Sequence, residues 1–455
     1  MAPAPGPAPA PGCYTLRPDA LSPAELLADL RRHCSHPGDL LLVQDLDGVC
    51  MELVRDPLQR RLDPRYVRHA RRLDGRFCVL TNGEHAGYRG VNRLVEQALA
   101  GQADPGREGL YLPGLAAGGV QLQDRHGSVS TPGVSAAELA FLQSLPERLG
   151  AGLRAWLPQV LPGLHGTELE RQLGLAVLDN PLSPTVNLNS LFRWITGGAA
   201  GRAPDPGLAV ALQANLLAQM EALLEEAERA GLAESFYLHI APNLVDADGR
   251  EQPVWASASG LGTTDVQFML RGAIKEAGLL VLINEHIARH HGVHPLGAGF
   301  HVRHAPRQLS ALLELACSRI PAALMPRLVG VADTITSRPG PEPGSWQRGG
   351  SDRGFLTLLQ QLGQAFDRPN RVVLVDSSGG EVCRPSFRDG TLAGLSDPDA
   401  PLGLDALLPG GPRQYRAFFA ELAQELGELG GEPGGEARDQ PPSGGPAPTP
   451  AEPYR

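Results

Sequence analysis

The stretch Leu40-Leu41-Leu42-Val43-Gln44-Asp45-Leu46-Asp47-Gly48-Val49-Cys50 decides how the rest of the chain is arranged. Its first half is an apolar run typical of a strand buried on both faces of a parallel sheet. Asp45 and Asp47 follow at the strand's carboxyl end, where open α/β sheets place their ligands. Side chains alternate along an extended chain, so both carboxylates point to one side. The pair therefore predicts a magnesium site, since magnesium prefers hard oxygen ligands; a plain Asp/Gly turn is the simpler alternative.

The composition limits the class of protein. A chain of 455 residues favours two domains plus tails, and 42% hydrophobic with 20% charged residues is ordinary for a soluble globular protein. The net charge of -10 gives no support to nucleic-acid binding or to a polybasic membrane anchor. We expect no signal peptide and no membrane span. The six cysteines are scattered without a C-x-x-C pair, which favours reduced thiols and a cytoplasmic protein.

The periodicity of apolar residues predicts the remaining elements. Helices are expected over 22–30, where Ser22 and Glu25 form a capping box, and over 66–73, 137–157, 209–230, 264–285, 355–362 and 415–429. Strands are expected over 40–44, 77–80, 235–240, 328–333 and 371–376, with a small antiparallel sheet over 108–130 that turns at 124–127. Residues 338–350 are predicted to form a Pro/Gly-rich loop. The tails 1–20 and 430–455 are predicted to be disordered.

The order of these elements predicts an α/β fold with two parts. Residues 40–80 form a strand–helix–strand unit of the kind that builds a Rossmann-like parallel sheet. The pattern changes after about residue 87 and returns at about residue 261. We therefore place a discontinuous core at 21–86 and 261–429, and an inserted α+β domain at 87–260.

Four polar clusters are predicted to meet at one edge of the core sheet: Asp45 with Asp47, Thr81 with Asn82, Lys275, and Asp333. In this order they resemble the four motifs of the haloacid dehalogenase superfamily of phosphotransferases. The resemblance implies a haloacid dehalogenase core, and it makes the insert a cap domain of the second type (C2). It also implies a phosphoric monoester hydrolase that requires Mg²⁺.

The roles that the resemblance implies agree with the chemistry of each residue. The Asp45 carboxylate is expected to attack phosphorus and form an aspartyl phosphate. Asp47 is expected to protonate the leaving alkoxide and then to deprotonate the attacking water. Thr81, Asn82 and Lys275 would bind the phosphoryl oxygens. Magnesium would be held by Asp45, the backbone carbonyl of Asp47 and Asp333.

The fourth motif departs from the superfamily's pattern. Ala332 stands where glycine is usual, and the residues after Asp333 offer no second carboxylate before the 338–350 loop. The next acid in a comparable setting is Asp352. Asp352 is either a further metal ligand or the N-cap of the following helix, and both interpretations stay open.

A narrower resemblance rests on four strings of residues: 43–54 (VQDLDGVCMELV), 80–85 (LTNGEH), 109–120 (GLYLPGLAAGGV) and 348–353 (RGGSDR). They are similar to those of glucosylglycerol-phosphate phosphatases, the salt-acclimation enzymes of cyanobacteria, over about 40–378. The resemblance implies hydrolysis of 2-O-(α-D-glucosyl)-glycerol 3-phosphate during compatible-solute synthesis, with a possible association with the synthase that makes this substrate. Another osmolyte phosphate (sucrose, trehalose or glucosylglycerate type) and a catalytically silent sugar-phosphate sensor are the alternatives.

Three further groups of residues have chemistry that suggests other sites. Asp179 and Asn187 in the insert have sugar-binding chemistry, although such residues more often form turns and caps. His286, His290, His291 and His294 are expected at a solvated helix end rather than around zinc, because no Cys or carboxylate completes a known pattern. The Gly-rich string 114–119 lacks the Lys-Ser/Thr of a phosphate loop, so nucleotide binding is not expected.

Overall fold

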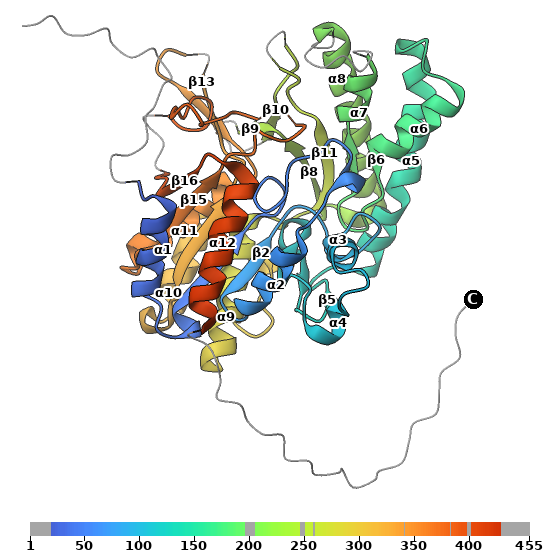
Figure 1. The fold of residues 1–455 in the computed structure, drawn as a ribbon. Helices are drawn as coiled ribbons and strands as arrows, with labels where there is room; N and C mark the ends of the chain where they lie inside the picture. Colours follow the sequence, from blue (N-terminus) through green and yellow to red (C-terminus); the bar gives the residue numbers. More distant parts are fainter. Residues whose placement is uncertain are drawn as a thin grey trace, which may run out of the picture.

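The computed structural model describes residues 20–195, 205–245, 251–257, 260–340, 342–382, 384–397 and 402–428. The predicted disordered tails lie outside these residues, apart from Ala20. Figure 1 shows a core built around one large sheet, with the helices of the insert grouped along one side of it.

The central sheet has eight strands in the order β16-β15-β12-β1-β2-β3-β4-β5. Its members are β1 (Leu40–Gln44), β2 (Phe77–Leu80), β3 (Gly114–Ala116), β4 (Gln121–Gln123), β5 (Val129–Ser130), β12 (Arg327–Ala332), β15 (Arg371–Val375) and β16 (Ala406–Leu408). All neighbours from β16 to β3 are parallel, whereas β4 and β5 join antiparallel. The predicted α/β class with a mostly parallel sheet is therefore confirmed.

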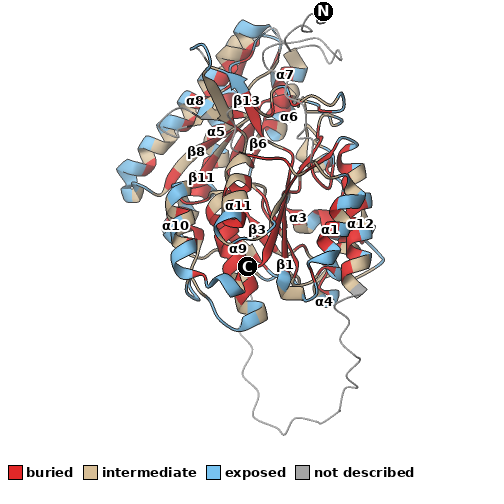
Figure 2. Ribbon diagram, turned by 90° about the vertical axis from the view of Figure 1, so that its left-hand side faces the viewer, coloured by how far each residue is buried: buried red, intermediate tan, exposed pale blue. Residues whose placement is uncertain are grey.

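Helices cover both faces of this sheet, as Figure 2 shows. One layer holds α1 (Pro23–Arg32), α2 (Pro64–Arg72), α3 (Val91–Ala98) and α12 (Gly411–Glu428), and the other α9 (Lys275–His291), α10 (Leu309–Arg319) and α11 (Arg353–Ala365). Strand β1 contributes to both: Leu40 and Leu42 pack into the first layer's apolar cluster, Leu41 and Val43 into the second's. Strand β1 is thus buried on both faces, as predicted.

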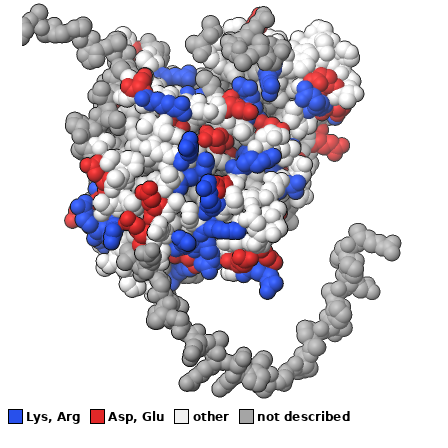
Figure 3. All heavy atoms as spheres, in the orientation of Figure 1, with Lys and Arg blue, Asp and Glu red and all other residues white. Residues whose placement is uncertain are grey.

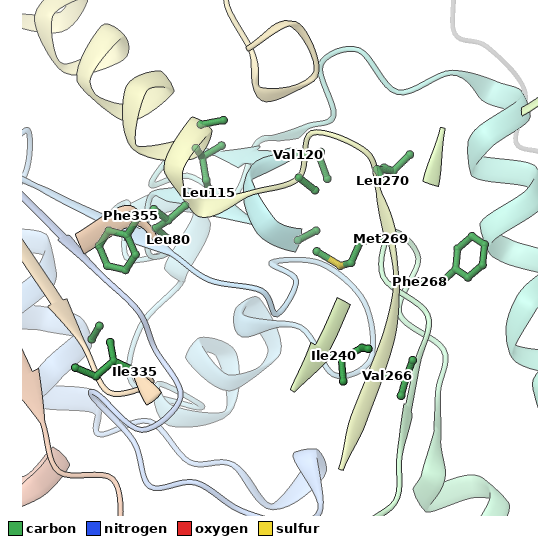
Figure 4. Close-up of a cluster of buried hydrophobic side chains, with 14 of the residues drawn as sticks. Leu80, Leu115, Val120, Ile240, Val266, Phe268, Met269, Leu270, Ile335 and Phe355 are labelled. Carbon is green, nitrogen blue, oxygen red and sulfur yellow. The ribbon is translucent and has the colours of Figure 1, made fainter. Parts of the chain in front are cut away.

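A second sheet belongs to the insert and is antiparallel, in the order β6-β7-β11-β8. It comprises β6 (Val177–Leu178), β7 (Thr185–Asn187), β8 (Phe236–Ala241) and β11 (Asp265–Leu270), and its helices are α5 (Ala136–Val160), α6 (Gly166–Ala176), α7 (Asn189–Ile195) and α8 (Pro206–Ala227). Val266, Phe268 and Ile240 are buried in the apolar cluster of Figure 4. We call this sheet and its four helices the cap.

A third, small sheet joins the two parts. The hairpin β9 (Asn243–Val245) and β10 (Glu251–Pro253) of the insert meets the hairpin β13 (Thr336–Pro339) and β14 (Trp346–Gly349) of the core through Val245 and Arg348. The remaining elements are short: α4 (Pro105–Glu108), η1 (Pro37–Asp39), η2 (Pro57–Gln59), η3 (Ala117–Gly119), η4 (Glu228–Leu232), η5 (Val302–His304) and η6 (Ala322–Leu324).

Two predicted elements were wrong. Residues 264–285 are not one helix: β11 ends at Leu270, a turn with Gly272 at φ +90° follows, and α9 begins at Lys275. Polar and apolar residues alternate over 265–268, which is the period of a strand. Residues 338–350 are not a simple loop, because β13 and β14 pair across them in a hairpin whose turn contains Gly344.

The boundaries of the insert also differ from the prediction of 87–260. Strands β3–β5 extend the central sheet, so the stretch 108–130, although antiparallel with its turn near 124–127 as expected, belongs with the core. Strand β11 belongs to the cap sheet, although 265–270 was assigned to the core. The elements of the cap therefore run from α5 to β11, apart from the β9–β10 hairpin that pairs with the core.

Within the described residues, one helix, at Pro206–Leu232, is long and apolar enough by composition to cross a membrane. This is weak evidence, because the core helix of a soluble protein passes the same test. Its buried residues Leu212, Leu216 and Met220 recur every four positions, on one face of the helix. They belong to the apolar cluster that includes the cap sheet, which agrees with the predicted packing role.

Candidate active site

Three polar residues follow neighbouring parallel strands at the same edge of the central sheet. Asp45 comes directly after β1, Thr81 after β2 and Asp333 after β12. Because these strands are adjacent and parallel, their carboxyl ends meet at one place. All three side chains are buried and line one cleft between the core and the cap.

Lys275 reaches this place from the first residue of α9. Its buried Nζ lies 2.8 Å from Asp45 Oδ2 and 2.6 Å from Asp352 Oδ1. Burial alone would lower the pKa of Lys275, but the carboxylates of Asp352 and Asp45 raise it above its ordinary value. Lys275 therefore keeps a positive charge between two acids.

Asp45, Asp333 and Asp352 form a cluster whose ligand atoms all lie within 4.8 Å of one another. Burial, then the charges of Asp352 and Asp45, raises the pKa of Asp333 to about 7. Burial likewise raises the pKa of Asp352 to about 6, with Asp45 adding to the effect and Lys275 opposing it. Asp333 Oδ2 is buried without a hydrogen-bond partner. Hard oxygen ligands, mutual repulsion and an unused buried oxygen fit a magnesium ion.

Asp352 stands at the N-cap position of α11, but its side chain makes no capping hydrogen bond. One carboxylate oxygen pairs with Lys275, and the other accepts a hydrogen bond from the backbone N–H of Thr334 at 3.0 Å. The side chain therefore points toward Asp45 and Asp333. Of the two interpretations left open by the sequence, the geometry favours a role at the metal cluster over capping.

Asp47 lies beside an arginine that the sequence analysis did not identify. Arg60 Nη1 donates to Asp47 Oδ2 at 3.2 Å, and the guanidinium is fixed by the carbonyl oxygens of Pro57 and Arg89. Burial and the neighbouring Asp45 raise the pKa of Asp47, although Arg60 opposes the shift. Asp47 remains about a third exposed, so a ligand in the cleft has access to it.

The loop after β2 supplies hydrogen-bonding groups next to the carboxylates. Thr81 Oγ1 accepts from the N–H of Gly83 at 3.2 Å, and Asn82 Nδ2 lies 3.1 Å from His239 Nε2. His239 is buried and its other ring nitrogen lies 2.7 Å from Glu251. Burial would lower the pKa of His239, but the Glu251 carboxylate raises it.

The cap lines the opposite wall of the cleft with polar side chains: Asn180, Thr185, Asn187, Asn189, Asp265 and Gln267. Two cross-strand rows order this wall. In one, Thr185 pairs with Gln267 and Gln267 with His239; in the other, Asn187 pairs with Asp265. Asn187 Nδ2 donates to Asp265 Oδ1 at 2.7 Å, and Gln267 Oε1 is buried without a partner. We call these two rows the polar cap face.

Arginines gather on one face of the molecule, and other arginines line the cleft. The chain carries a net charge of -10, yet Figure 3 shows Lys and Arg side chains gathered over the middle of one face, where α2 lies. The exposed arginines of α2 are Arg65, Arg68, Arg71 and Arg72. None of these four lines the cleft, where Arg60, Arg89 and Arg384 stand among the acids Asp45, Asp47, Glu84, Asp265 and Asp333.

Two predictions at other places need correction. Asp179 does not line the cleft: its side chain is 63% exposed and pairs with Arg89. Asn187, by contrast, does line it. Of the four histidines expected at a solvated helix end, His286 is buried: its Nε2 lies 3.0 Å from Gly38 O, and burial lowers its pKa to about 4. His290 is half-buried with Nε2 2.9 Å from Gly75 O, whereas His291 and His294 are exposed, as expected.

Several cleft residues were missed by the sequence analysis: Arg60, Glu84, Arg89, His239, Asp265 and Gln267. Asp265 and Gln267 alternate with the apolar residues Val266 and Phe268, a pattern that indicates a strand, although the prediction placed them in a helix. Glu84 lay inside the quoted string 80–85 but was given no role. Arg60 and Arg89 act through contacts that no local pattern shows.

The solved structures that resemble this chain include two domains from Candida albicans. The C-terminal domain of Candida albicans trehalose-6-phosphate phosphatase has 13% sequence identity and a TM-score of 0.42, and covers 90% of this chain and 99% of that chain. The C-terminal domain of Candida albicans trehalose synthase regulatory protein has 9% identity and a TM-score of 0.42, and covers 87% and 97%. Similarity at this level says nothing about the substrate of the present chain.

Sequence comparison is far more specific. The family model described as glucosylglycerol-phosphate phosphatase matches residues 39–423. A glucosylglycerol-phosphate phosphatase of Synechocystis sp. is 46% identical over 398 residues, which are 85% of this chain and 93% of the relative. The match includes both the catalytic edge of the core sheet and the cap. The chain belongs to the glucosylglycerol-phosphate phosphatase family.

Proposed function

We propose that the protein hydrolyses 2-O-(α-D-glucosyl)-glycerol 3-phosphate to glucosylglycerol and phosphate. One observation carries this proposal. Asp45, which pairs with Lys275, lies on one wall of the cleft, and the polar cap face forms the other wall. The first wall suits a phosphoryl group, and the second suits a polyhydroxylated group. The name of the Synechocystis relative supports the choice of substrate.

Magnesium is the cofactor of this proposal. Asp45, Asp333 and Asp352 would hold it, together with the backbone carbonyl of Asp47. When bound, the ion would neutralise charge so that an anionic nucleophile can approach an anionic phosphoryl group. Lys275, Thr81 and Asn82 would bind the phosphoryl oxygens on the side of the α9 N-terminus and the β2 loop.

In the first step, the Asp45 carboxylate attacks phosphorus. An Asp45 O–P bond forms, the bond from phosphorus to the glycerol oxygen breaks, and Asp47 gives its proton to that oxygen. In the second step, Asp47 takes a proton from water, whose oxygen bonds to phosphorus as the Asp45 O–P bond breaks. Phosphate leaves, and both carboxyl groups return to their starting state.

There are two kinds of alternative: a phosphatase that acts on another sugar phosphate, and a protein that binds a sugar phosphate without hydrolysing it. Sucrose, trehalose and glucosylglycerate phosphates would fit the same division of the cleft into a phosphoryl wall and a polyhydroxyl wall. A silent sensor would still bind the phosphoryl group through Lys275, but it would have no use for a carboxylate nucleophile such as Asp45. We also propose that the protein acts in the cytoplasm, near the synthase that makes its substrate, and without a membrane or nucleic-acid partner.

The test is phosphate release from a panel of osmolyte phosphates, with magnesium and with excess chelator. The proposal expects the largest kcat/KM for glucosylglycerol 3-phosphate, and activity only with magnesium. A higher kcat/KM for another sugar phosphate would make that compound the substrate and would leave the proposed hydrolysis mechanism unchanged. Binding of sugar phosphates without phosphate release under any condition would establish the sensor instead.

A further inference from the structure

A buried glutamate of the core holds a turn of the cap. Glu84 lies three residues after Thr81, and its side chain is 4% exposed. Its Oε1 accepts hydrogen bonds from Leu182 N at 2.8 Å, Ser183 N at 2.8 Å and Ser183 Oγ at 2.9 Å. One carboxylate oxygen thus binds three donors that lie between β6 and β7 of the cap sheet.

An arginine of the same loop holds the segment just before that turn. Arg89 is 10% exposed and pairs with Asp179 through Nη1, while its Nη2 donates to Gly174 O at 3.3 Å. Between the contacts of Glu84 and Arg89, Pro181 lies against Gly87: a Cβ added to Gly87 would lie 3.4 Å from Pro181 Cδ. The core loop 84–89 therefore contacts the cap segment 174–183 at three successive points.

The core side of this contact is itself fixed next to the catalytic carboxylates. The N–H of Ala117 donates to Gly83 O at 2.6 Å, and the N–H of His85 donates to the Gln121 side chain at 2.5 Å. The carbonyl of Arg89 accepts from Arg60, which in turn binds Asp47 at 3.2 Å. The loop cannot shift without disturbing Asp47 or the strands beside it.

The cap side of the contact leads directly into the polar cap face. Ser183, bound by Glu84, accepts at its carbonyl from Thr185 Oγ1 at 2.7 Å and from Asn180 Nδ2 at 3.4 Å. Both Asn180 and Thr185 line the cleft. The position of Ser183 relative to the core therefore sets where these two side chains stand.

We propose that Glu84 and Arg89 form a core-to-cap clamp that fixes the polar cap face at the correct distance from the phosphoryl site. They are positioning residues for substrate choice and do not take part in the chemistry. The inference rests on the proposed function, because it assigns the cap face to the sugar. Asp179 then acts as the partner of Arg89 and not as a sugar contact.

The kinetic test compares the preferred sugar phosphate of the wild-type enzyme with p-nitrophenyl phosphate, which has no sugar for the cap to contact. In Glu84→Ala and Arg89→Ala, KM for the sugar phosphate should rise about tenfold or more, while kcat for p-nitrophenyl phosphate stays within about threefold. Glu84→Gln keeps the accepting oxygen and should restore most of the loss. Asp179→Ala should reproduce part of the effect of Arg89→Ala, because the contact of Arg89 with Gly174 O remains, and the double variant should be no worse than Arg89→Ala.

Glu96→Ala and Arg93→Ala are matched controls on the neighbouring helix α3, where Glu96 is exposed and bound to Tyr111. Both should behave as wild type. A loss of activity on both substrates in equal proportion, or an unchanged KM for the sugar phosphate in both clamp variants, would overturn the proposal.

A second measurement does not depend on activity. The backbone N–H groups of Leu182 and Ser183 donate to Glu84, so their hydrogen exchange should be at least about tenfold faster in Glu84→Ala and nearly unchanged in Glu84→Gln. Unchanged exchange in Glu84→Ala would refute the clamp even if the enzyme proves to prefer another phosphate. An inactive wild type with the expected exchange pattern would refute the proposed function and leave the clamp in place.

Discussion

The ammonium group of Lys275 lies 2.6 Å from the carboxylate of Asp352, 77 residues further along the chain. This pair accounts for the unusual fourth motif, in which no acid follows Asp333 closely. The hairpin β13–β14 fills the interval, and its end at Gly349 returns the chain to the cluster so that Asp352 stands beside Asp333 and Asp45. Asp352, which follows the hairpin, thus takes the place of the second acid that is missing directly after Asp333.

The first prediction concerns the nucleophile. Asp45→Asn keeps the shape of the side chain but removes the anion, so kcat should fall by about four orders of magnitude or more. The melting temperature of the metal-free variant should not fall, because the substitution removes one of three clustered carboxylates. Steady-state phosphate release and calorimetry check the two parts. Activity within tenfold of wild type would contradict the aspartyl-phosphate route.

The second prediction concerns the metal and Asp352. Excess chelator should abolish activity, magnesium should restore it, and calcium should not, because its larger and looser coordination shell misplaces the phosphoryl group. Asp352→Asn should raise the magnesium concentration for half-maximal activity by about tenfold or more. Asp63→Asn provides the control, since Asp63 caps α2 away from the cluster. An unchanged magnesium requirement in Asp352→Asn would exclude it from the metal site.

Much of the core could be predicted from the sequence because its signals are local. The apolar run before Asp45, the similar run before Asp333 and the polar residues after β2 each mark the end of a buried strand, and parallel neighbours bring such ends together. Lys275 lies beside Asp45 even though its helix was placed wrongly, because α9 begins at this residue.

The cap was harder to predict because its contacts are long-range. Only the short segment Arg271-Gly272-Ala273-Ile274 separates β11 from α9. The sequence pattern of the strand therefore runs into that of the helix, and the two were predicted as one helix. Glu84 reaches a partner 98 residues away, and nothing in the local pattern of either segment indicates the other. Asp179 has the chemistry of a sugar ligand, but it pairs with Arg89 and does not line the cleft.

The third prediction uses the pKa of Glu84. Burial raises this pKa from 4.5 to about 7, so the folded state holds the proton more tightly than the unfolded state does. Its contribution to stability is therefore complete below about pH 4.5 and is lost as pH rises toward 7. Glu84→Gln has no charge to bury, so its free energy of unfolding relative to wild type should increase by about 1–3 kcal/mol between pH 5 and pH 8.

Denaturant unfolding of both proteins at the two pH values, at constant ionic strength and without magnesium, measures the difference. Glu96→Gln is the control, since Glu96 is exposed and should show no such dependence. A constant difference between Glu84→Gln and wild type across this range would mean that Glu84 is ionised in the folded protein with an ordinary pKa.

The last prediction concerns the polar cap face. The residues at the core edge address only the phosphoryl group, so discrimination among sugar phosphates has to come from side chains such as Asn187 and Asp265. These two are joined by a 2.7 Å hydrogen bond and stand opposite each other on β7 and β11. A site built to bind hydroxyl groups rejects a ligand that lacks them, because its own polar groups are left unpaired. Asn187→Ala and Asp265→Asn should therefore lower kcat/KM for glucosylglycerol 3-phosphate by about 10- to 100-fold while sparing p-nitrophenyl phosphate.

Gln172→Ala serves as the control for a polar residue of the cap that lies outside the cleft, on α6. It should leave the ratio of the two kcat/KM values unchanged. If Asn187→Ala and Asp265→Asn instead reduce both substrates equally, their hydrogen bond holds the cap sheet together and the sugar is recognised by other residues. If they alter the ranking among sucrose, trehalose and glucosylglycerol phosphates, the two rows of the polar cap face determine which sugar the enzyme accepts.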